Sequence, residues 1–463
     1  MHLISRRSII STLLLNALTI GKVAGQARLH QTPKPLSPDA ITHDWKSFLG
    51  PLHNATSTET PLNRNIPPPL VWELAKGSGY ASPAISGNRL VFIDRSVDKE
   101  IVKCLDSETG SSQWEIHYPT AYEDRYGYNN GPRSSPIIDS GLVYTMGAEG
   151  KLHCIELESG KIIWKLNLGD EYRVLHNFFG IGSTPLVEGE LLIINVGVPG
   201  GPSVVGLNRL TGQEVWRVNN KWGPSYSSPV PALIYGQRRV FVFAGGESNP
   251  PTGGLMSINP INGQVDFVFP WRSRTYESVN ASCPVVFNNK VFISASYNTG
   301  GALLEIQPDF TFKLLWTTKE FGLHFNTAIH RKGYIYGFDG RNMGDASLVC
   351  LNCKNGKVVW REFPQWTEIF KIRGQERRQL MGTARGSLLA ADGQFLCLGE
   401  LGHLLWMDLS SKGYKEVSRG WLFAARESWT LPVLSRGLLY VNQNTRELLQ
   451  GKGPRLLCYD IRG

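Results

Sequence analysis

One pattern of apolar and polar positions recurs along the chain. Its clearest copy opens with Ser134-Ser-Pro136, continues as the β-rich run from Leu142 to Met146, alternates apolar and polar residues over 152–157, and ends in a glycine turn before Trp164. Alternation with period two is typical of half-buried strands, and a glycine turn joins two of them into a hairpin. Proline at the first position of a strand costs no ladder hydrogen bond. Four short strands without a helical period predict one β-propeller blade.

The end of each copy sets the register of the repeat. A turn glycine is followed four residues later by tryptophan in the pairs Gly110 and Trp114, Gly160 and Trp164, Gly212 and Trp216, and Gly356 and Trp360. Related copies carry Phe267 in place of tryptophan, Trp316 after a turn without glycine, and Trp72 after a proline run. Four-stranded repeats of about 40–50 residues are typical of propellers. We expect the tryptophans to pack between blades.

The strand openers count the blades independently. They are Ala81-Ser-Pro83, Ser134-Ser-Pro136, Ser183-Thr-Pro185, Ser227-Ser-Pro229, Ser282-Cys-Pro284, Asn326-Thr-Ala328, Arg385-Gly-Ser387 and Thr430-Leu-Pro432. The last copy stops without an outer strand, whereas residues 70–74 form an outer strand with no blade before them. Joining the two pairs strands that would otherwise be exposed edges. The prediction is an all-β, eight-bladed propeller of four-stranded antiparallel blades over residues 45–463, with its ring closed by the N-terminal strand.

The N-terminus is predicted to be an export signal over residues 1–27. Arg6 and Arg7 precede an apolar run over 9–20, and small residues follow at 23–27. The run is shorter than the roughly 20 residues that span a bilayer. Paired arginines favour the twin-arginine route, and the general secretory route stays open. Residues 28–44 contain three prolines and are predicted to be a linker. No later apolar run is long enough for a membrane span, so we expect a periplasmic or otherwise exported protein.

Charge and cysteines exclude several classes of protein. The 463 residues carry a formal charge of +9, and the basic residues are scattered, with Arg238-Arg239 and Arg377-Arg378 as the densest pairs. A nucleic-acid-binding protein would show a basic stripe instead. The seven cysteines are odd in number and follow the repeat, which does not fit a disulfide framework. Cys350 and Cys353 form a CxxC pair without a following histidine or a second pair, so neither haem attachment nor a zinc site is indicated. A monomer is expected.

The repeat resembles that of the pyrroloquinoline-quinone (PQQ)-like propeller family. The similarity rests on the Ser-Ser-Pro, glycine-turn and tryptophan elements and on Asp44-Trp45-Lys-Ser-Phe48-Leu-Gly50-Pro51, which is similar to a motif of exported PQQ-like propellers. It covers residues 44–463 and implies the fold and export. It does not imply one function, because propellers host unrelated sites.

For a quinoprotein dehydrogenase, the resemblance would imply PQQ, a calcium ion held by carboxylate and amide oxygens, an aspartate base and a disulfide of adjacent cysteines. No two cysteines are adjacent. PQQ and calcium therefore stay open as cofactors without a metal site being predicted. A PQQ- and calcium-dependent dehydrogenase of alcohols or sugars is the alternative function.

A ligand site is predicted where the innermost strands begin, at one mouth of the central channel. The residue three positions before each strand-opening proline, or before its equivalent in the degenerate openers, should lie near that mouth. These positions are Tyr80, Arg133, Gly182, Tyr226, Ala281, Phe325, roughly Arg385, and Trp429. With their neighbours, the candidate binding residues are Tyr80, Arg133, His176, Tyr226, Asn280, Asn326, Arg385, Glu427 and Trp429. The set is rich in aromatic, amide and arginine side chains and shows no catalytic motif. We therefore expect a propeller of the cell envelope that binds a small ligand or acts as a protein-interaction scaffold for an envelope protein.

Overall fold

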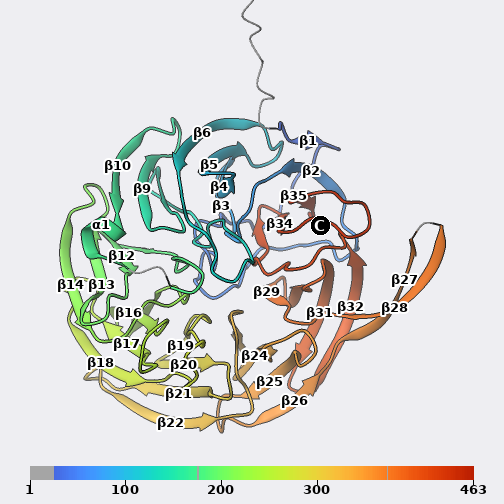
Figure 1. Cartoon of the computed structure of the whole chain (residues 1–463). Coiled ribbons are helices and arrows are strands. Elements are labelled where there is room, and N and C mark those ends of the chain that lie inside the picture. The colour runs from blue at the N-terminus through green and yellow to red at the C-terminus, as the bar shows by residue number, and fades with distance from the viewer. Residues whose placement is uncertain (1–24, 175–176, 373) are drawn as a thin grey trace, which may run out of the picture.

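In the described part of the chain, eight sheets surround a central axis and a ninth, two-stranded sheet lies outside the ring (Figure 1). The structure is a computed structural model that describes residues 25–174, 177–372 and 374–463. In that part of the chain the only helix is α1 (Leu168–Tyr172), which follows blade 2. The predicted all-β, eight-bladed propeller is confirmed. Residues 1–24 of the predicted export signal lie outside the described residues.

Six blades follow one another along the chain as four-stranded antiparallel sheets. Blade 1 contains β3 (Ala84–Ser86), β4 (Arg89–Ser96), β5 (Lys99–Asp106) and β6 (Ser112–Pro119), and blade 2 contains β7 (Ile137–Asp139), β8 (Leu142–Met146), β9 (Lys151–Glu156) and β10 (Ile162–Asn167). Blade 3 contains β11 (Leu186–Glu188), β12 (Leu191–Asn195), β13 (Gly201–Asn208) and β14 (Glu214–Asn220), and blade 4 contains β15 (Val230–Ile234), β16 (Gln237–Ala244), β17 (Gly254–Ile258) and β18 (Val265–Pro270). Blade 5 contains β19 (Val285–Phe287), β20 (Lys290–Ala295), β21 (Gly300–Ile306) and β22 (Phe312–Thr318), and blade 6 contains β23 (Ile329–Arg331), β24 (Tyr334–Asp339), β25 (Ser347–Asn352) and β26 (Val358–Glu362).

Blades 7 and 8 complete the ring. Blade 7 contains β29 (Ser387–Ala391), β30 (Gln394–Leu398), β31 (His403–Ser410) and β32 (Gly413–Trp421). Blade 8 contains β33 (Val433–Ser435), β34 (Leu438–Gln443) and β35 (Arg455–Asp460), followed by the N-terminal strands β2 (Leu70–Ala75) and β1 (Arg28–Leu29). Strand β2 pairs with β35, as the two incomplete ends of the repeat predicted. In the segment expected to be a linker, residues 28–44, the Lys34 N–H also donates to Asp460 at 2.7 Å.

Each outer-strand tryptophan locks its blade to the next one. The indole Nε1 of Trp114 in blade 1 donates to the Leu157 carbonyl of blade 2 at 2.8 Å, and the same bond recurs from Trp72, Trp164, Trp216, Trp316 and Trp360. The ring of Trp114 lies on Gly160, where a Cβ atom would come within 2.8 Å of it and where φ is +73°. The turn glycine of one blade is therefore required by the tryptophan of the blade before it.

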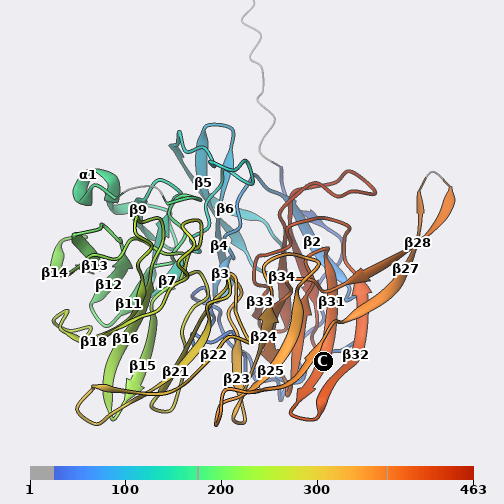
Figure 2. The ribbon, with the colours of Figure 1, turned by 60° about the horizontal axis from the view of Figure 1, so that its bottom comes forward.

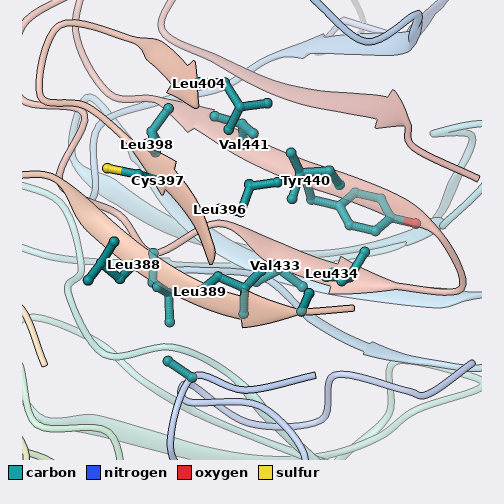
Figure 3. Packing of buried hydrophobic residues seen from close by; sticks show 14 of the residues in the cluster. Leu388, Leu389, Leu396, Cys397, Leu398, Leu404, Val433, Leu434, Tyr440 and Val441 are labelled. Atoms are coloured by element: carbon teal, nitrogen blue, oxygen red, sulfur yellow. The ribbon is translucent and has the colours of Figure 1, made fainter. Parts of the chain in front are cut away.

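One exception to the tryptophan–glycine pairing supports this explanation. Blade 4 ends in Phe267, and the following turn of blade 5 is the one without glycine. Here Phe267 packs against Phe312 of blade 5, with ring centroids 4.8 Å apart. Both changes in the repeat therefore belong to one interface. Elsewhere the blades meet through apolar residues, and Figure 3 shows Leu388, Leu396, Val433 and Val441 packed where blades 7 and 8 face each other.

In each of blades 1 to 5, the middle residue of the strand opener ties its inner strand to that of the next blade. Its backbone N–H donates to the side chain of the equivalent residue in the next blade. These bonds, of 2.9 to 3.3 Å, run from Ser82 to Ser135, Ser135 to Thr184, Thr184 to Ser228, Ser228 to Cys283 and Cys283 to Thr327. The hydroxyl or thiol of the repeat therefore holds the channel wall together, which gives Cys283 a structural role. All seven cysteines are buried free thiols.

A hairpin that the repeat did not predict projects from the rim between blades 6 and 7 (Figures 1 and 2). It consists of β27 (Gln365–Ile372) and β28 (Gln375–Gly382), which form a separate two-stranded sheet. The pattern missed it because a single hairpin has no second copy with which it can be aligned. In the described residues, no helix has the length and hydropathy needed to cross a bilayer.

Candidate functional site at the channel mouth

An N-terminal segment crosses the centre of the ring and forms a plug in the channel (Figure 1). This plug segment, residues 44–57, contains the Trp-Lys-Ser-Phe-Leu-Gly-Pro motif. Trp45 forms a bridge with Ile85 of blade 1, and Thr56 forms one with Ala390 of blade 7. The Ile138 N–H of blade 2 donates to the Lys46 carbonyl at 2.9 Å. The motif that resembled those of exported propellers therefore partly closes the channel.

Above the plug lies an aromatic cavity of about 430 Å³. Phe48 and Leu49 of the plug line it, and they also line a second cavity of about 560 Å³ with walls from blades 2, 3 and 4. These two side chains thus stand between the two cavities. The upper cavity is of a size that suits a small organic ligand.

All eight positions predicted from the strand openers line this upper cavity. They are Tyr80, Arg133, Gly182, Tyr226, Ala281, Phe325, Arg385 and Trp429. The rule works because every blade starts its inner strand in the same register, so equivalent residues meet around one axis. A propeller mouth can therefore be located from its repeat alone.

Arg133 is held at the wall by a buried ion pair. Its Nη2 lies 2.6 Å from Asp124 Oδ2, and the Asp124 side chain is 0% exposed. Asp124 also accepts bonds from the N–H groups of Tyr126 and Tyr128, at 2.9 and 3.4 Å. The guanidinium lies 5.4 Å from the Tyr80 ring centroid. The ion pair therefore positions the arginine and the two tyrosines of its loop together.

A second buried ion pair holds Arg385. Its guanidinium makes two bonds to Glu400, whose side chain is 2% exposed, and lies 5.1 Å from the centroid of the Trp429 ring. The indole Nε1 of Trp429 donates to the same carboxylate at 2.7 Å. Because both groups share one buried acid, the arginine and the tryptophan face are fixed relative to each other.

Tyr80 and Tyr226 line the cavity and are held by other bonds, whereas the predicted Glu427 does not line it. The Tyr80 hydroxyl donates to Glu427, and burial together with this bond raises the pKa of Tyr80 above its usual range. Tyr226 accepts a bond from the Phe179 N–H at 2.6 Å, and burial raises its pKa as well. Both phenols therefore stay protonated at neutral pH. Glu427 adopts a left-handed φ of +59° beside the aromatic wall.

The three remaining candidates differ in position. Asn280 is 1% exposed and does not line the cavity, because its Nδ2 donates to the carbonyls of Ala244 and Trp271. Asn326 lines the cavity, but its Nδ2 donates to the carbonyls of residues 385 and 386. It replaces the opener bond at Gly386, which has no side chain. Both amides therefore hold the wall. His176 lies outside the described residues.

Sequence reasoning missed most of the aromatic wall. The additional lining residues are Tyr126, Tyr128, Phe178, Phe179, Tyr297 and Arg341. They lie on loops between blades or between strands, where the repeat pattern ends and nothing in the spacing places a side chain. Arg341 differs from the other two arginines. Its guanidinium lies 4.3 Å from the centroid of the Tyr297 ring, and, unlike Arg133 and Arg385, it has no carboxylate partner among the described residues.

One half-buried histidine, His324, and one buried histidine, His153, make the stability of the fold sensitive to acid. Burial lowers the pKa of His324, which lines the cavity, to about 4, and Arg385 and Arg341 lower it further. Burial also lowers the pKa of His153 to about 4; its ring centroid lies 4.5 Å from that of Tyr118. Both side chains are neutral in the folded protein at pH 6, whereas about half of such groups are protonated in an unfolded chain near pH 6.5.

We expect the free energy of unfolding to fall as the pH drops from about 6.5 to about 4, because the unfolded chain binds protons that the folded state refuses. Each histidine contributes a slope of up to about 1.4 kcal/mol per pH unit in that window. The change His153→Phe keeps a ring beside Tyr118 and should make the pH dependence shallower. Urea unfolding at several pH values measures it. His117→Phe, at an exposed site, is the control, and an equal reduction of the slope there would contradict the assignment.

Comparison with known proteins places the fold in a family. A family model described as the outer membrane protein assembly factor BamB matches residues 97–362, more than half of the chain. The chain belongs to this family. The match runs from blade 1 to the end of blade 6 and confirms the resemblance to the PQQ-like repeat. No curated protein matches the chain in sequence.

Solved structures agree with this assignment. BamB from Moraxella catarrhalis has a TM-score of 0.55 at 15% identity, with 85% of this chain and 97% of that chain covered. A europium-containing methanol dehydrogenase has a TM-score of 0.64 at 12% identity, with 90% of this chain and 98% of that chain covered. At such identities the likeness shows the fold alone. A BamB-like and a dehydrogenase-like propeller are thus equally compatible with the shape of the chain.

Proposed function

We propose that this chain is an exported propeller of the cell envelope that binds a small, ring-containing anion in the aromatic cavity. The observation that carries the proposal is the pairing of flat aromatic walls with Arg341, a guanidinium without a carboxylate partner among the described residues. Aromatic faces suit an apolar ring, and a guanidinium suits a carboxylate. The membership in the BamB family and the arginine pair at residues 6 and 7 support the envelope location.

The ordered arginines contribute in a different way. Arg133 and Arg385 are each neutralised by a buried acid, so they offer spare N–H donors and flat faces rather than a net charge. A ligand anion would therefore be drawn toward Arg341 at the rim, while its ring lies between Phe325, Trp429 and the tyrosines of the opposite wall. This division of roles predicts one orientation for the ligand.

The alternative is a quinoprotein dehydrogenase of alcohols or sugars, which the aromatic cavity at the channel mouth favours. The flat aromatic walls suit a flat ring system with carboxylates such as PQQ, but the acids of the described residues are not grouped as metal ligands. Among the described residues, no group of three or more His, Cys, Asp or Glu side chains is placed to hold a metal. Asp124 and Glu400, the buried acids nearest the wall, are bonded to arginines. We therefore derive no redox step for this chain.

The proposal is tested by titration calorimetry of the purified chain with PQQ and with benzoate, each against its neutral counterpart, without calcium. We expect an anion to bind more tightly than the neutral ring, and Arg341→Gln to weaken it by about tenfold or more, because a bond to a charged group contributes about 1.5–3 kcal/mol. Lys354→Gln, at an exposed turn, is the matched control. Failure of both anions to bind would contradict the proposal, and calcium-dependent dye reduction with an alcohol would favour the alternative.

A further inference from the structure

The base of the β27–β28 hairpin is firmly attached to blade 7. Trp366 is 8% exposed, and its ring centroid lies 4.8 Å from that of His403. The guanidinium of Arg419 lies 4.4 Å from the centroid of the Trp366 ring. Glu368 accepts bonds from the Trp366 indole and from His403 Nε2, both at 3.0 Å. The ring of Phe370 meets that of Trp421 at 5.6 Å. One face of the hairpin therefore packs against blade 7.

The opposite face of the hairpin is apolar and basic, and it is open. Ile369 stands opposite Arg378, and Leu380 opposite Thr367, so these side chains share the face turned away from Trp366. Ile369 is 52% and Leu380 61% exposed. The strands pair only with each other among the described residues, which leaves both outer edges of the hairpin without backbone partners. An unpaired edge beside apolar side chains is a template for another strand.

An apolar cavity of about 240 Å³ lies at the base of this open face. Leu380 lines it together with Phe363, which is 51% exposed, and Met343. Met343 belongs to the same short loop as Arg341 and Asn342, which line the aromatic cavity of the channel mouth. The hairpin face therefore continues, through one loop, to the rim of the ligand site.

We propose that this face binds an extended, acidic segment of a partner protein, which adds as a strand along β28 and places an apolar side chain in the cavity at the hairpin base. The charge of the face decides the chemistry of the partner. Lys371 and Arg378 lie on it, and Glu376 is the acid beside them, bonded to Arg378 only through an exposed contact of 3.4 Å. Exposed ion pairs of that kind contribute little free energy of stabilisation, so both cations remain available to the carboxylates of a partner.

An added strand explains the apolar and the charged features together. Side chains of an extended segment alternate with period two, so every second one faces the hairpin. A segment that alternates acidic and apolar residues can thus set carboxylates near Lys371 and Arg378 while its backbone completes the unpaired edge. The proposal stands apart from the ligand in the channel, because no residue of β27 or of β28 lines the aromatic cavity in the described structure.

The test uses the purified chain and a labelled synthetic peptide of alternating Glu and Leu, as long as β28, in fluorescence anisotropy. Peptides of alternating Lys and Leu and of alternating Glu and Ser serve as comparisons. We expect the Glu–Leu peptide to bind best, more weakly at higher salt, and to slow hydrogen exchange in β28. The double variant Lys371→Glu/Arg378→Glu should weaken binding by about tenfold or more, as should Leu380→Ser. Lys354→Glu/Lys357→Glu makes the same charge change on blade 6 and should not.

Each other outcome overturns the proposal. Equal binding of the Glu–Leu and Lys–Leu peptides would mean unspecific contact, and no binding would mean that the face takes no such strand. A dimer in light scattering that the Lys371→Glu/Arg378→Glu change abolishes would show that a second copy covers the face. Binding to vesicles with anionic lipid that the same change abolishes, without peptide binding, would assign the face to a membrane surface. Circular dichroism melts verify that the exposed substitutions leave the fold intact.

Discussion

Replacement of Trp45 by alanine is expected to lower the free energy of unfolding by about 3–5 kcal/mol, the range for removal of a large buried aromatic side chain. Trp45 is 0% exposed and belongs to a core cluster that includes residues of blades 1, 6, 7 and 8. Its ring lies on Gly50, where a Cβ atom would come within 2.7 Å and φ is +76°. The side chain thus holds both ends of the turn that carries Phe48 and Leu49. Urea denaturation followed by tryptophan fluorescence measures the loss.

The plug gives this variant a second, more specific effect. Phe48 and Leu49 form the floor of the aromatic cavity, so loosening the turn should weaken ligand binding as well as the fold. Trp316→Ala, at the interface of blades 5 and 6, removes a comparable ring far from the plug and should destabilise the protein without changing binding by the folded fraction. A loss below about 1 kcal/mol for Trp45→Ala would mean that the plug is not part of the cooperative core.

The second large effect is expected from Arg385→Ala. The change leaves Glu400, 2% exposed, as a buried carboxylate without its cation, and breaking a buried pair in this way costs about 3–5 kcal/mol. The Trp429 indole and the backbone N–H of residue 385 remain as donors to Glu400, but two neutral bonds do not compensate a buried charge. Chemical denaturation should show the loss, and the flat face beside Trp429 should lose order at the cavity wall.

Two further variants separate the buried charge from lost packing. Adding Glu400→Gln to Arg385→Ala removes the stranded charge and should restore a substantial part of the stability. Arg89→Ala breaks an ion pair whose acid, Glu158, is 67% exposed, and should cost less than about 1 kcal/mol. Equal losses for Arg89→Ala and Arg385→Ala, or no recovery in the double variant, would contradict the view that the buried acid at the mouth is held by its arginine.

The site shows where sequence reasoning stops. Seven of the eight opener positions could be placed at the mouth because each lies four residues before an inner strand that recurs in register, and Arg385 lies two residues before its strand. Asp124 and Glu400, which hold two of those positions, could not be found in the same way, since they lie on loops with no repeat. Asn280 was predicted for its residue type, yet the structure uses its amide to satisfy buried carbonyls. The side-chain amide of a loop residue can form hydrogen bonds with backbone groups as readily as with a ligand.

The tryptophan–glycine pairs show the converse case. Their spacing is visible in the sequence as a repeat, but its cause is a contact between blades. Gly160 leaves room for the ring of Trp114 from the preceding blade. The joint loss of both elements at Phe267 and in the turn before Phe312 is explained only by their contact. The sequence repeat therefore reflects contacts between neighbouring blades.

By itself, the sequence determined the blade, the number of blades, the closure of the ring by both termini and the position of the channel mouth. These features depend on strands with period two, on turns and on their recurrence, and each of these is determined by a short stretch of sequence. Only the tertiary structure decided that the Trp45 motif plugs the channel, that three arginines and the loop aromatics form one cavity, and that residues 365–382 leave the ring as a hairpin. The physical reason is that these arrangements depend on contacts between segments that occur once and lie far apart along the chain, and such contacts have no period for a sequence pattern to reveal.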